Sequence, residues 1–291
     1  MVSAVCAAMT QPMFAPRSLL FVPGSRPDMI AKVPRWRPDA TVIDLEDAVA
    51  ASDKEQARLA GVSAAAGLQP SGLVALVRIN PFGSPWFADD LRAVAASAAR
   101  GVVLPKYESA DVVAEIRAQL PSAALVIAGL ETARGVADCR GLLAHGVDAV
   151  YFGAEDYVAD LGGRRTDTGE EVLYARSEVM LAARLAGVGA IDQAVVAIRD
   201  DARFIADAEA GKSIGYTGKI CVHPRQVELA HQVFTPSPEE IEHARRVLEM
   251  AEAGAGTVGG EMVDEVHVRM ARRLIARAEP RPSQDGSRSD G

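Results

Sequence analysis

Short apolar runs recur along the chain, and helix-length segments separate them. Most of these runs end at a polar or charged residue or at a proline. Short apolar runs that alternate with helices are typical of parallel strands in an α/β sheet. The expected strands are residues 18–22, 40–45, 73–79, 101–104, 124–130, 149–152, 190–195 and 218–222.

Helix-length patterns follow each of these strands. Strands and helices that alternate eight times over roughly 220 residues predict an α/β fold, the (β/α)8 TIM barrel. An open doubly wound sheet is the alternative. No GxGxxG string follows the first strand, however, and Gly187 and Gly189 lack a third glycine, so we expect no dinucleotide site. The expected helices are residues 28–33, 52–66, 86–98, 109–119, 132–145, 172–186, 201–210 and 225–234.

The pattern changes beyond residue 235. Pro236 and Pro238 interrupt the chain, and two helices, 239–253 and 263–278, flank a glycine-rich loop at 254–260. We therefore expect residues 17–235 to form a catalytic TIM barrel. Residues 236–278 are expected to be a C-terminal helical appendage that acts as a lid or an oligomerisation segment. A disordered leader is expected at 1–16 and a disordered tail at 279–291.

The composition of the chain argues against nucleic acids and membranes as binding partners. The 291 residues are 49% hydrophobic and 24% charged, as in an ordinary soluble globular protein. A formal net charge of −8 argues against non-specific nucleic-acid binding. No run approaches the roughly 18 apolar residues of a membrane span. The three cysteines show neither metal-type spacing nor a disulfide pattern, so a protein of the reducing cytoplasm is expected.

Charged and polar residues gather at the C-terminal ends of the predicted strands. In a barrel these ends meet at one mouth, where the active site lies. Several carboxylates in a small volume repel one another unless a cation binds or protons remain bound. Oxygen ligands without a His or Cys cluster favour a hard cation such as Mg2+. The residues of this expected rim are Asp44, Glu46, Asp47, Arg78, Asn80, Lys106, Glu131, Glu155, Asp156 and His223.

Glu131 and Asp156 follow adjacent strands and are the preferred ligands of Mg2+, with Mn2+ as the alternative metal. The competing interpretation of either acid is a salt bridge or a helix N-cap. Arg78 lies in an apolar strand, where its guanidinium needs a partner. It could bind a substrate carboxylate or thioester oxygen, or form an internal ion pair with Glu46 or Asp47.

Three further basic or aromatic groups have two interpretations each. Lys106 carries the same ambiguity as Arg78. Lys32, near the Pro23-Gly24 turn, could bind a phosphate or be ordinary surface charge. His223 is interpreted as structural or substrate-lining. The residues alone thus predict a Mg2+-dependent barrel enzyme that acts on a carboxylated substrate.

Eight strings, in order, resemble the family of citrate lyase beta subunits and the related malyl-CoA, citramalyl-CoA and β-hydroxyacyl-CoA lyases. Together they cover about residues 17–275. The strings are RSLLFVPGSRPDM (17–29), VIDLEDAV (42–49), VRIN (77–80), LPKYES (104–109), ETARG (131–135), FGAEDYVADLG (152–162), YTGKICVHPRQ (216–226) and EMVD (261–264).

This resemblance implies a TIM barrel with Mg2+ on Glu131 and Asp156, and Arg78 as the substrate-binding and catalytic arginine. It implies that Asp264 is the catalytic acid/base, which the family often supplies from the appendage of a neighbouring subunit. Such sharing implies a homotrimer or a multiple of it. Glu265 departs from the Ser-Pro or Met-Pro pair that many relatives carry after the MVD string. The resemblance further implies a coenzyme A and substrate site at Phe21, Pro23, Gly24, Lys32, Val222 and His223.

The expected function is Mg2+-dependent cleavage or formation of a carbon–carbon bond in a 3-hydroxyacyl-CoA thioester. The products are a 2-oxo acid, or a related carbonyl compound, and acetyl-CoA or a related acyl-CoA. A metal-dependent 2-oxo acid aldolase without coenzyme A is one alternative, and an acyl-CoA thioester hydrolase is another. A non-catalytic scaffold subunit of a larger lyase complex is the third. Loops 82–87 and 162–170 are expected to set the acyl selectivity.

Overall fold

The chain divides into two compact units between Phe234 and Thr235. The computed structural model describes residues 13–252, 257–258, 261–262 and 264–278. The expected tail at 279–291 and residues 1–12 of the expected leader lie outside the described residues. No helix in the described part of the chain has the length and apolar character that crossing a bilayer requires.

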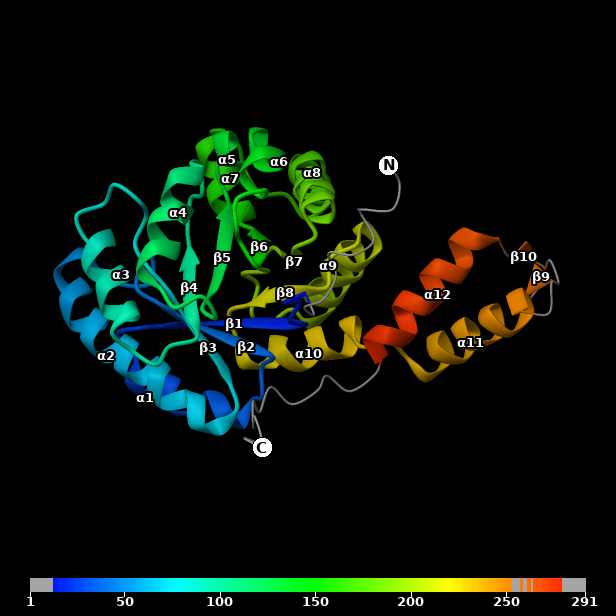
Figure 1. The fold of residues 1–291 in the computed structure, drawn as a ribbon, viewed down its shortest axis with the longest axis horizontal. Helices are drawn as coiled ribbons and strands as arrows, with labels where there is room; N and C mark the ends of the chain where they lie inside the picture. The colour runs from blue at the N-terminus through cyan, green and yellow to red at the C-terminus, as the bar shows by residue number, and fades with distance from the viewer. Residues whose placement is uncertain (1–12, 253–256, 259–260, 263, 279–291) are drawn as a thin grey trace, which may run out of the picture. The chain divides into compact units, whose positions relative to one another are not determined.

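The first unit is a closed barrel of eight parallel strands in sequence order, which confirms the TIM-barrel prediction (Figure 1). The first strand pairs with the second and also with the eighth, and this pairing closes the barrel. The strands are β1 (Ser18–Pro23), β2 (Ala40–Asp44), β3 (Val74–Arg78), β4 (Gly101–Leu104), β5 (Leu125–Leu130), β6 (Ala149–Phe152), β7 (Gly189–Asp192) and β8 (Gly218–Cys221).

Side chains along each strand alternate between the barrel interior and the surrounding helices, because successive strand residues point to opposite faces. Val42 and Leu76 belong to the inner hydrophobic cluster, whereas their neighbours Ile43 and Val77 belong to the outer one. Phe14, which lies in the expected leader, packs against the inner cluster. The same alternation decides which residues at the strand ends face the mouth.

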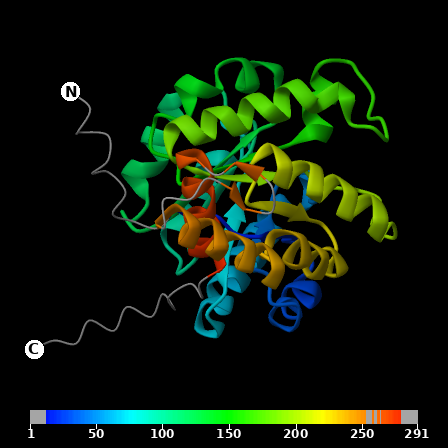
Figure 2. The same cartoon turned by 90° about the vertical axis from the view of Figure 1, so that its right-hand side faces the viewer.

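Helices cover the outside of the barrel. The long helix α8 (Glu170–Ala186) contacts β6 and β7, and α9 (Asp201–Ile214) contacts β8; Figure 2 shows both in yellow-green to yellow beside the barrel. Three short 3-10 helices are η1 (Val33–Arg35), η2 (Ala51–Asp53) and η3 (Gln69–Ser71). The α-helices of this unit are α1 (Pro27–Ile30), α2 (Lys54–Leu68), α3 (Phe87–Ala95), α4 (Ala110–Gln119), α5 (Ala133–Ala137), α6 (Cys139–Leu142), α7 (Ala154–Asp160), α8 (Glu170–Ala186), α9 (Asp201–Ile214) and α10 (Pro224–Phe234).

Two helical segments differ from the prediction. The helix expected over 132–145 is divided into α5 and α6 at Asp138, whose backbone (φ −99°, ψ 4°) is not helical. Gly135 and Gly141 weaken the helix on either side of this break. Helix α7 occupies a stretch for which no helix was predicted. Its first turn carries Glu155 and Asp156, and acids are favourable at a helix N-terminus.

The second unit is a helical hairpin. Helices α11 (Pro238–Glu252) and α12 (Glu265–Ala278) pack through Ala244, Val247 and Ala271. Two short strands, β9 (Thr257–Val258) and β10 (Glu261–Met262), pair in antiparallel fashion in and beside the stretch that was expected to be a glycine-rich loop. The two helices agree with the two expected from the sequence, whereas this strand pair was not predicted.

Candidate active site

Four polar side chains share the inner face at the C-terminal ends of the strands. Asp44 ends β2 and Arg78 ends β3, and the two are register partners. Glu131 directly follows β5, two residues beyond the register partner of Tyr151, Gly129 on β5. Because the period of a strand is two residues, Glu131 and Tyr151 point the same way as Ile127 and Ala149 of the inner cluster. These four positions therefore bring two acids, one guanidinium and one phenol to the mouth of the barrel.

Glu131 is almost fully buried, with 3% of its surface exposed. Its Oε1 accepts a hydrogen bond from the backbone N–H of Lys106 at 2.8 Å, and its Oε2 accepts one from the Tyr151 hydroxyl at 2.9 Å. A Cβ at Gly153 would lie 2.5 Å from Oε2, so only glycine leaves room for this carboxylate. Burial raises the pKa of Glu131 to about 7; Arg78 opposes this rise, and Glu46 and Asp156 add to it.

Asp156 lies in the first turn of α7, and its carboxylate is 3.4 Å from Nζ of Lys106. Its side chain is 36% exposed, so it is open to solvent where Glu131 is not. The adjacent Glu155 accepts a hydrogen bond from Arg165 at 2.9 Å. The structure thus separates the two neighbouring acids: Asp156 joins the cluster around Lys106, and Glu155 serves an ion pair with Arg165.

Lys106 contacts Glu131 through its backbone, and Glu46 and Asp156 through its ammonium group. Its backbone has a φ of 49°, which is uncommon outside glycine, and in this conformation its N–H meets Glu131. Its ammonium group bonds to Glu46 and lies 3.9 Å from Asp47. Burial lowers the pKa of Lys106, but the bond to Glu46 and the nearby carboxylates raise it above its usual value overall. The carboxylates therefore keep Lys106 charged.

Glu46 is held between two cations. Its Oε1 accepts the hydrogen bond from Lys106, and its Oε2 lies 2.7 Å from Nη1 of Arg78. The geometry of this contact is not that of a hydrogen bond. Within the described part of the chain, the buried Oε2 atom accepts no hydrogen bond at all. Burial raises the pKa of Glu46, although Arg78 and Lys106 both oppose the rise.

Arg78 forms the internal ion pairs that were one of its two predicted roles. Its Nε and Nη2 donate to the two oxygens of Asp44 at 2.6 and 2.7 Å. The predicted partner Glu46 is confirmed as a contact, whereas Asp47 lies 4.0 Å away. Burial opposes the charge, but the hydrogen bonds to Asp44 hold the pKa of Arg78 well above its usual value. The guanidinium is a permanently charged, fixed group at the mouth.

The end of β1 forms one side of the mouth. The guanidinium carbon of Arg78 lies 5.3 Å from the centroid of the Phe21 ring, within the range of a cation–π contact. Pro23 is the last residue of β1, and the Gly24 N–H donates to the carbonyl of Asp44 at 2.8 Å. Lys32 is half exposed, with Nζ 4.0 Å from Asp28. Phe21 contacts a side chain of the charged cluster, which comprises Asp44, Glu46, Arg78, Lys106, Glu131 and Asp156, whereas Gly24 contacts the backbone of Asp44.

The remaining predicted positions lie apart from these contacts. The Val222 N–H donates to Gln226, and its side chain is 40% exposed. The backbone N–H of Arg225 donates to Nδ1 of His223 at 3.2 Å, a local turn contact. Asn80, from the expected rim, bonds to Asp90 through both its backbone and its side chain. Asn80 is therefore structural.

Asp264 belongs to the second unit and precedes α12. Its Oδ1 accepts hydrogen bonds from the backbone N–H groups of Val266 and His267, at 2.9 and 3.2 Å. The His267 ring lies 2.7 Å from the same oxygen. Hydrogen bonds from His267 lower the pKa of Asp264 below its usual value. Asp264 thus begins the helix as its cap and carries an ionised, half-exposed carboxylate.

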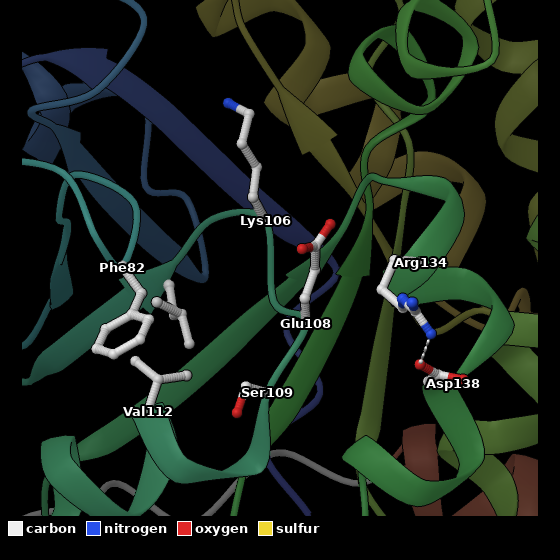
Figure 3. A pocket seen from close by; sticks show the side chains of 8 residues that line it. Phe82, Lys106, Glu108, Ser109, Val112, Arg134 and Asp138 are labelled. Atoms are coloured by element: carbon white, nitrogen blue, oxygen red, sulfur yellow. Dashed lines mark hydrogen bonds and ion pairs between the residues drawn. The ribbon is translucent and has the colours of Figure 1, made fainter.

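A cavity of about 370 Å3 lies beside the charged cluster, and Lys106 lines both (Figure 3). The ammonium of Lys106 points away from the apolar side of this cavity, which Phe82 and Val112 provide. On the opposite side Arg134 is paired with Asp138 at 3.3 Å. The cavity therefore combines an apolar wall with charge that is largely compensated within it.

The donor set fits a divalent cation that completes its coordination with external oxygens. Among the described residues, no group of three or more His, Cys, Asp or Glu side chains is arranged to hold a metal ion. Glu131 and Asp156 supply only carboxylate oxygens, and each touches Lys106. Mg2+ prefers one or two carboxylates together with water and substrate oxygens. A nearby cation would also favour the ionised form of the buried Glu131.

Two residues of the charged mouth, Tyr151 and Asp44, were not assigned a role from the sequence. Tyr151 was taken only as part of an apolar run, although it lies two residues after Ala149 and therefore shares the inward face of that residue. Asp44 was placed on the rim without a role, yet it is the closest partner of Arg78. This pair follows from the register between β2 and β3, and that register cannot be predicted from a single sequence.

The relationship to known proteins follows from comparison of the chain with them. A profile of the family described as HpcH/HpaI aldolase/citrate lyase matches residues 17–224. The chain belongs to this family. Membership confirms the resemblance seen in the sequence strings, and the match ends at the first residue of α10, Pro224.

Three known proteins illustrate the similarity. A citrate lyase subunit beta-like protein of Deinococcus radiodurans is 47% identical over 274 residues, covering 89% of this chain and 96% of that protein. A (3S)-malyl-CoA thioesterase of Cereibacter sphaeroides is 33% identical over 270 residues, covering 90% and 94%. The protein CitE of Mycobacterium tuberculosis, solved with magnesium, acetoacetate and coenzyme A, has a TM-score of 0.80 and 34% identity, covering 91% and 98%.

Proposed function

We propose that the chain is a Mg2+-dependent carbon–carbon lyase that acts on a 3-hydroxyacyl-CoA thioester. It cleaves, or forms, the bond between the hydroxyl-bearing carbon and the carbon next to the thioester. The products of cleavage are a 2-oxo acid, or a related carbonyl compound, and an acyl-CoA. The observation that carries this proposal is that Glu131 and Asp156 both contact Lys106 at the barrel mouth, beside the fixed charge of Arg78.

Glu131 and Asp156 would hold the metal, and Mn2+ has the same ligand preference. The donor chemistry supports this role, as does the CitE structure, which was solved with magnesium. When bound, the metal supplies Lewis-acid polarisation of the oxygen that becomes the carbonyl. Lys106 keeps the surrounding carboxylates partly neutralised, so the buried acids tolerate one another before the cation arrives.

Arg78 would bind the substrate and stabilise negative charge as the bond breaks. A guanidinium has five N–H donors; Asp44 accepts hydrogen bonds from two of them, and Nη1 forms an ion pair with Glu46 without a hydrogen bond. The rest can meet a carboxylate or a thioester oxygen. Because Asp44 fixes the plane of the group, these donors need little rearrangement as charge develops. Phe21, Pro23, Gly24, Lys32, Val222 and His223 would complete the coenzyme A and substrate site.

Asp264 would move the proton. Its ionised carboxylate can take the proton of the substrate hydroxyl, and the carbon–carbon bond then breaks to a carbonyl and an enolate. The same proton returns from Asp264 to the enolate carbon, so no other proton source is required. We propose that residues 236–278 present Asp264 as a lid within a homotrimer, or a multiple of it, as the family resemblance implies.

Thioester hydrolysis is the second candidate. The observation that favours it is the relative named (3S)-malyl-CoA thioesterase, which matches 90% of this chain. Hydrolysis releases free coenzyme A and an intact hydroxy acid, whereas lyase activity leaves the thioester on the acyl product.

The proposal is tested by incubating the purified protein and Mg2+ with malyl-, citramalyl-, citryl- and 3-hydroxy-3-methylglutaryl-CoA. The released carbonyl acid is trapped as a hydrazone, and free thiol is measured in parallel. Carbonyl acid without free thiol supports the lyase. Free thiol with no carbonyl acid supports the hydrolase. Carbonyl acid released from free hydroxy-oxo acids in a parallel incubation, and not from the thioesters, supports an aldolase without coenzyme A.

A further inference from the structure

Tyr151 links the two charged sides of the candidate active site. It lies on β6 at an inner-facing position and is 2% exposed. Its hydroxyl donates to Oε2 of Glu131 at 2.9 Å. Its ring meets that of Phe21 edge to face, with centroids 6.1 Å apart, and Phe21 lies beneath the charge of Arg78 at 5.3 Å. One aromatic pair therefore connects the buried acid to the guanidinium.

The Tyr151 hydroxyl is one of two hydrogen-bond donors to the Glu131 carboxylate. The other oxygen, Oε1, accepts the backbone N–H of Lys106 at 2.8 Å. One donor on each oxygen fixes the rotation of the carboxylate as well as its position. A carboxylate oxygen has two lone pairs, so each oxygen of Glu131 keeps one for another partner.

The fold makes room for this pair with two glycines. A Cβ at Gly129 would lie 2.3 Å from the Tyr151 hydroxyl oxygen, and a Cβ at Gly153 would lie 2.5 Å from Oε2 of Glu131. Real Cβ atoms do not approach so closely, so a side chain at either position would displace one member of the pair. The hydrogen bond thus depends on backbone space that neighbouring strands leave open.

We propose that Tyr151 is a positioning residue that orients the Glu131 carboxylate for a divalent cation. The inference rests on the proposed function, in which Glu131 is a metal ligand. Groups that hydrogen-bond to a metal ligand fix its orientation, and their loss typically weakens metal affinity by about 10–100-fold. Phenylalanine keeps the ring, and with it the packing against Phe21, and removes only the hydroxyl.

The test is a titration of the full chain with Mn2+, in which electron paramagnetic resonance measures the concentration of unbound ion. It is carried out on the wild type, Tyr151→Phe and Tyr107→Phe. Tyr107 is the matched control: it is 1% exposed, and its hydroxyl donates to the Leu142 carbonyl at 3.0 Å, away from Glu131. We expect Tyr151→Phe to raise the Kd for Mn2+ by about 10–100-fold, and Tyr107→Phe to leave it within about twofold. Thermal unfolding shows whether both variants keep the fold.

A purely structural tyrosine would lower the melting temperature without changing the Kd. Equal Mn2+ affinity in wild type and Tyr151→Phe overturns the inference while leaving the proposed function standing. An equal loss of affinity in Tyr107→Phe also overturns it, because the effect would then not belong to Glu131. If the wild type itself binds no Mn2+, the proposed function fails, and the inference fails with it.

Discussion

Arg78 and Asp44 face each other at the ends of adjacent barrel strands, joined by two parallel hydrogen bonds of 2.6 and 2.7 Å. Both side chains are nearly buried, at 12% and 4% exposure. A bidentate pair of this kind fixes the plane of the guanidinium as well as its position. Nη1 is thereby left facing Glu46, at the centre of the charged cluster.

Replacing Arg78 with lysine should lower kcat/KM by about 100–1,000-fold, because the charge remains but the fixed fork of donors is lost. The measurement is steady-state kinetics with the best substrate of the thioester screen. Arg58→Lys is the matched control, since Arg58 is 11% exposed, pairs with the buried Asp90 and lies on α2 outside the cluster. Both variants should lose stability, but only Arg78→Lys should lose activity. Equal activity losses would show that the effect is general destabilisation.

The neighbouring acids of α7 should behave differently. Asp156→Asn should abolish metal-dependent turnover, because it removes one of the two proposed ligand carboxylates. Glu155→Gln should retain turnover within about tenfold, because Glu155 contacts Arg165 and not Lys106. Activity measured across a Mg2+ titration distinguishes the two variants. An inactive Glu155→Gln beside an active Asp156→Asn would mean that the wrong acid had been assigned.

These two acids also show where sequence reasoning stops. The end of the apolar run 149–152 placed Glu155 and Asp156 together at the mouth, and in the structure both lie in the first turn of α7, directly after β6. Successive helix residues point about 100° apart, so only one of two neighbours can face a given direction. Which one does so depends on where α7 begins, and α7 was not predicted. Asp156 was preferred because it follows the strand next to that of Glu131, and the family resemblance implied the same acid, but the position after a strand does not by itself distinguish Asp156 from Glu155.

Pairing across strands was equally inaccessible from the sequence. Because the C-terminal ends of barrel strands meet at one mouth, the predicted strand ends were sufficient to place Arg78 and Glu131 near it. They do not specify which residue of the next strand lies opposite. Asp44 as the main partner of Arg78 and Tyr151 as the donor to Glu131 therefore emerge only from the three-dimensional structure.

A second buried cluster of charged residues lies outside the barrel interior. We expect it to contribute to the stability of the fold and not to turnover. Lys219 on β8 is fully buried, and its ammonium contacts Asp192 at 2.9 Å and Asp207 more closely. Replacing Lys219 with methionine leaves both carboxylates with Arg176 as their remaining cation, which should cost about 3–5 kcal/mol of unfolding free energy. Urea denaturation measures this cost. Turnover per folded molecule should stay near wild type, and a proportionate loss of turnover would place the cluster in the catalytic machinery.

Asp39 should contribute a pH-dependent part of the stability. Burial alone would raise the pKa of Asp39, but hydrogen bonds from Arg17 and His231 hold it well below the usual 3.8. A carboxyl with a lowered folded-state pKa stabilises the fold above its unfolded pKa, and this stabilisation is lost as the pH falls below it. The difference in unfolding free energy between wild type and Asp39→Asn should therefore be largest near neutral pH and shrink below about pH 4. A difference that stays constant from pH 7 to pH 3 would contradict the assignment.

The measurement that tests the central claim most directly is mass-spectrometric product analysis of one thioester reaction, run with Mg2+ and again after removal of the metal with EDTA. The account predicts acyl-CoA and a carbonyl acid in equal amounts with Mg2+, no cleavage after EDTA, and recovery when Mg2+ is restored. Cleavage that survives metal removal, or free coenzyme A with an intact hydroxy acid as the products, would contradict it.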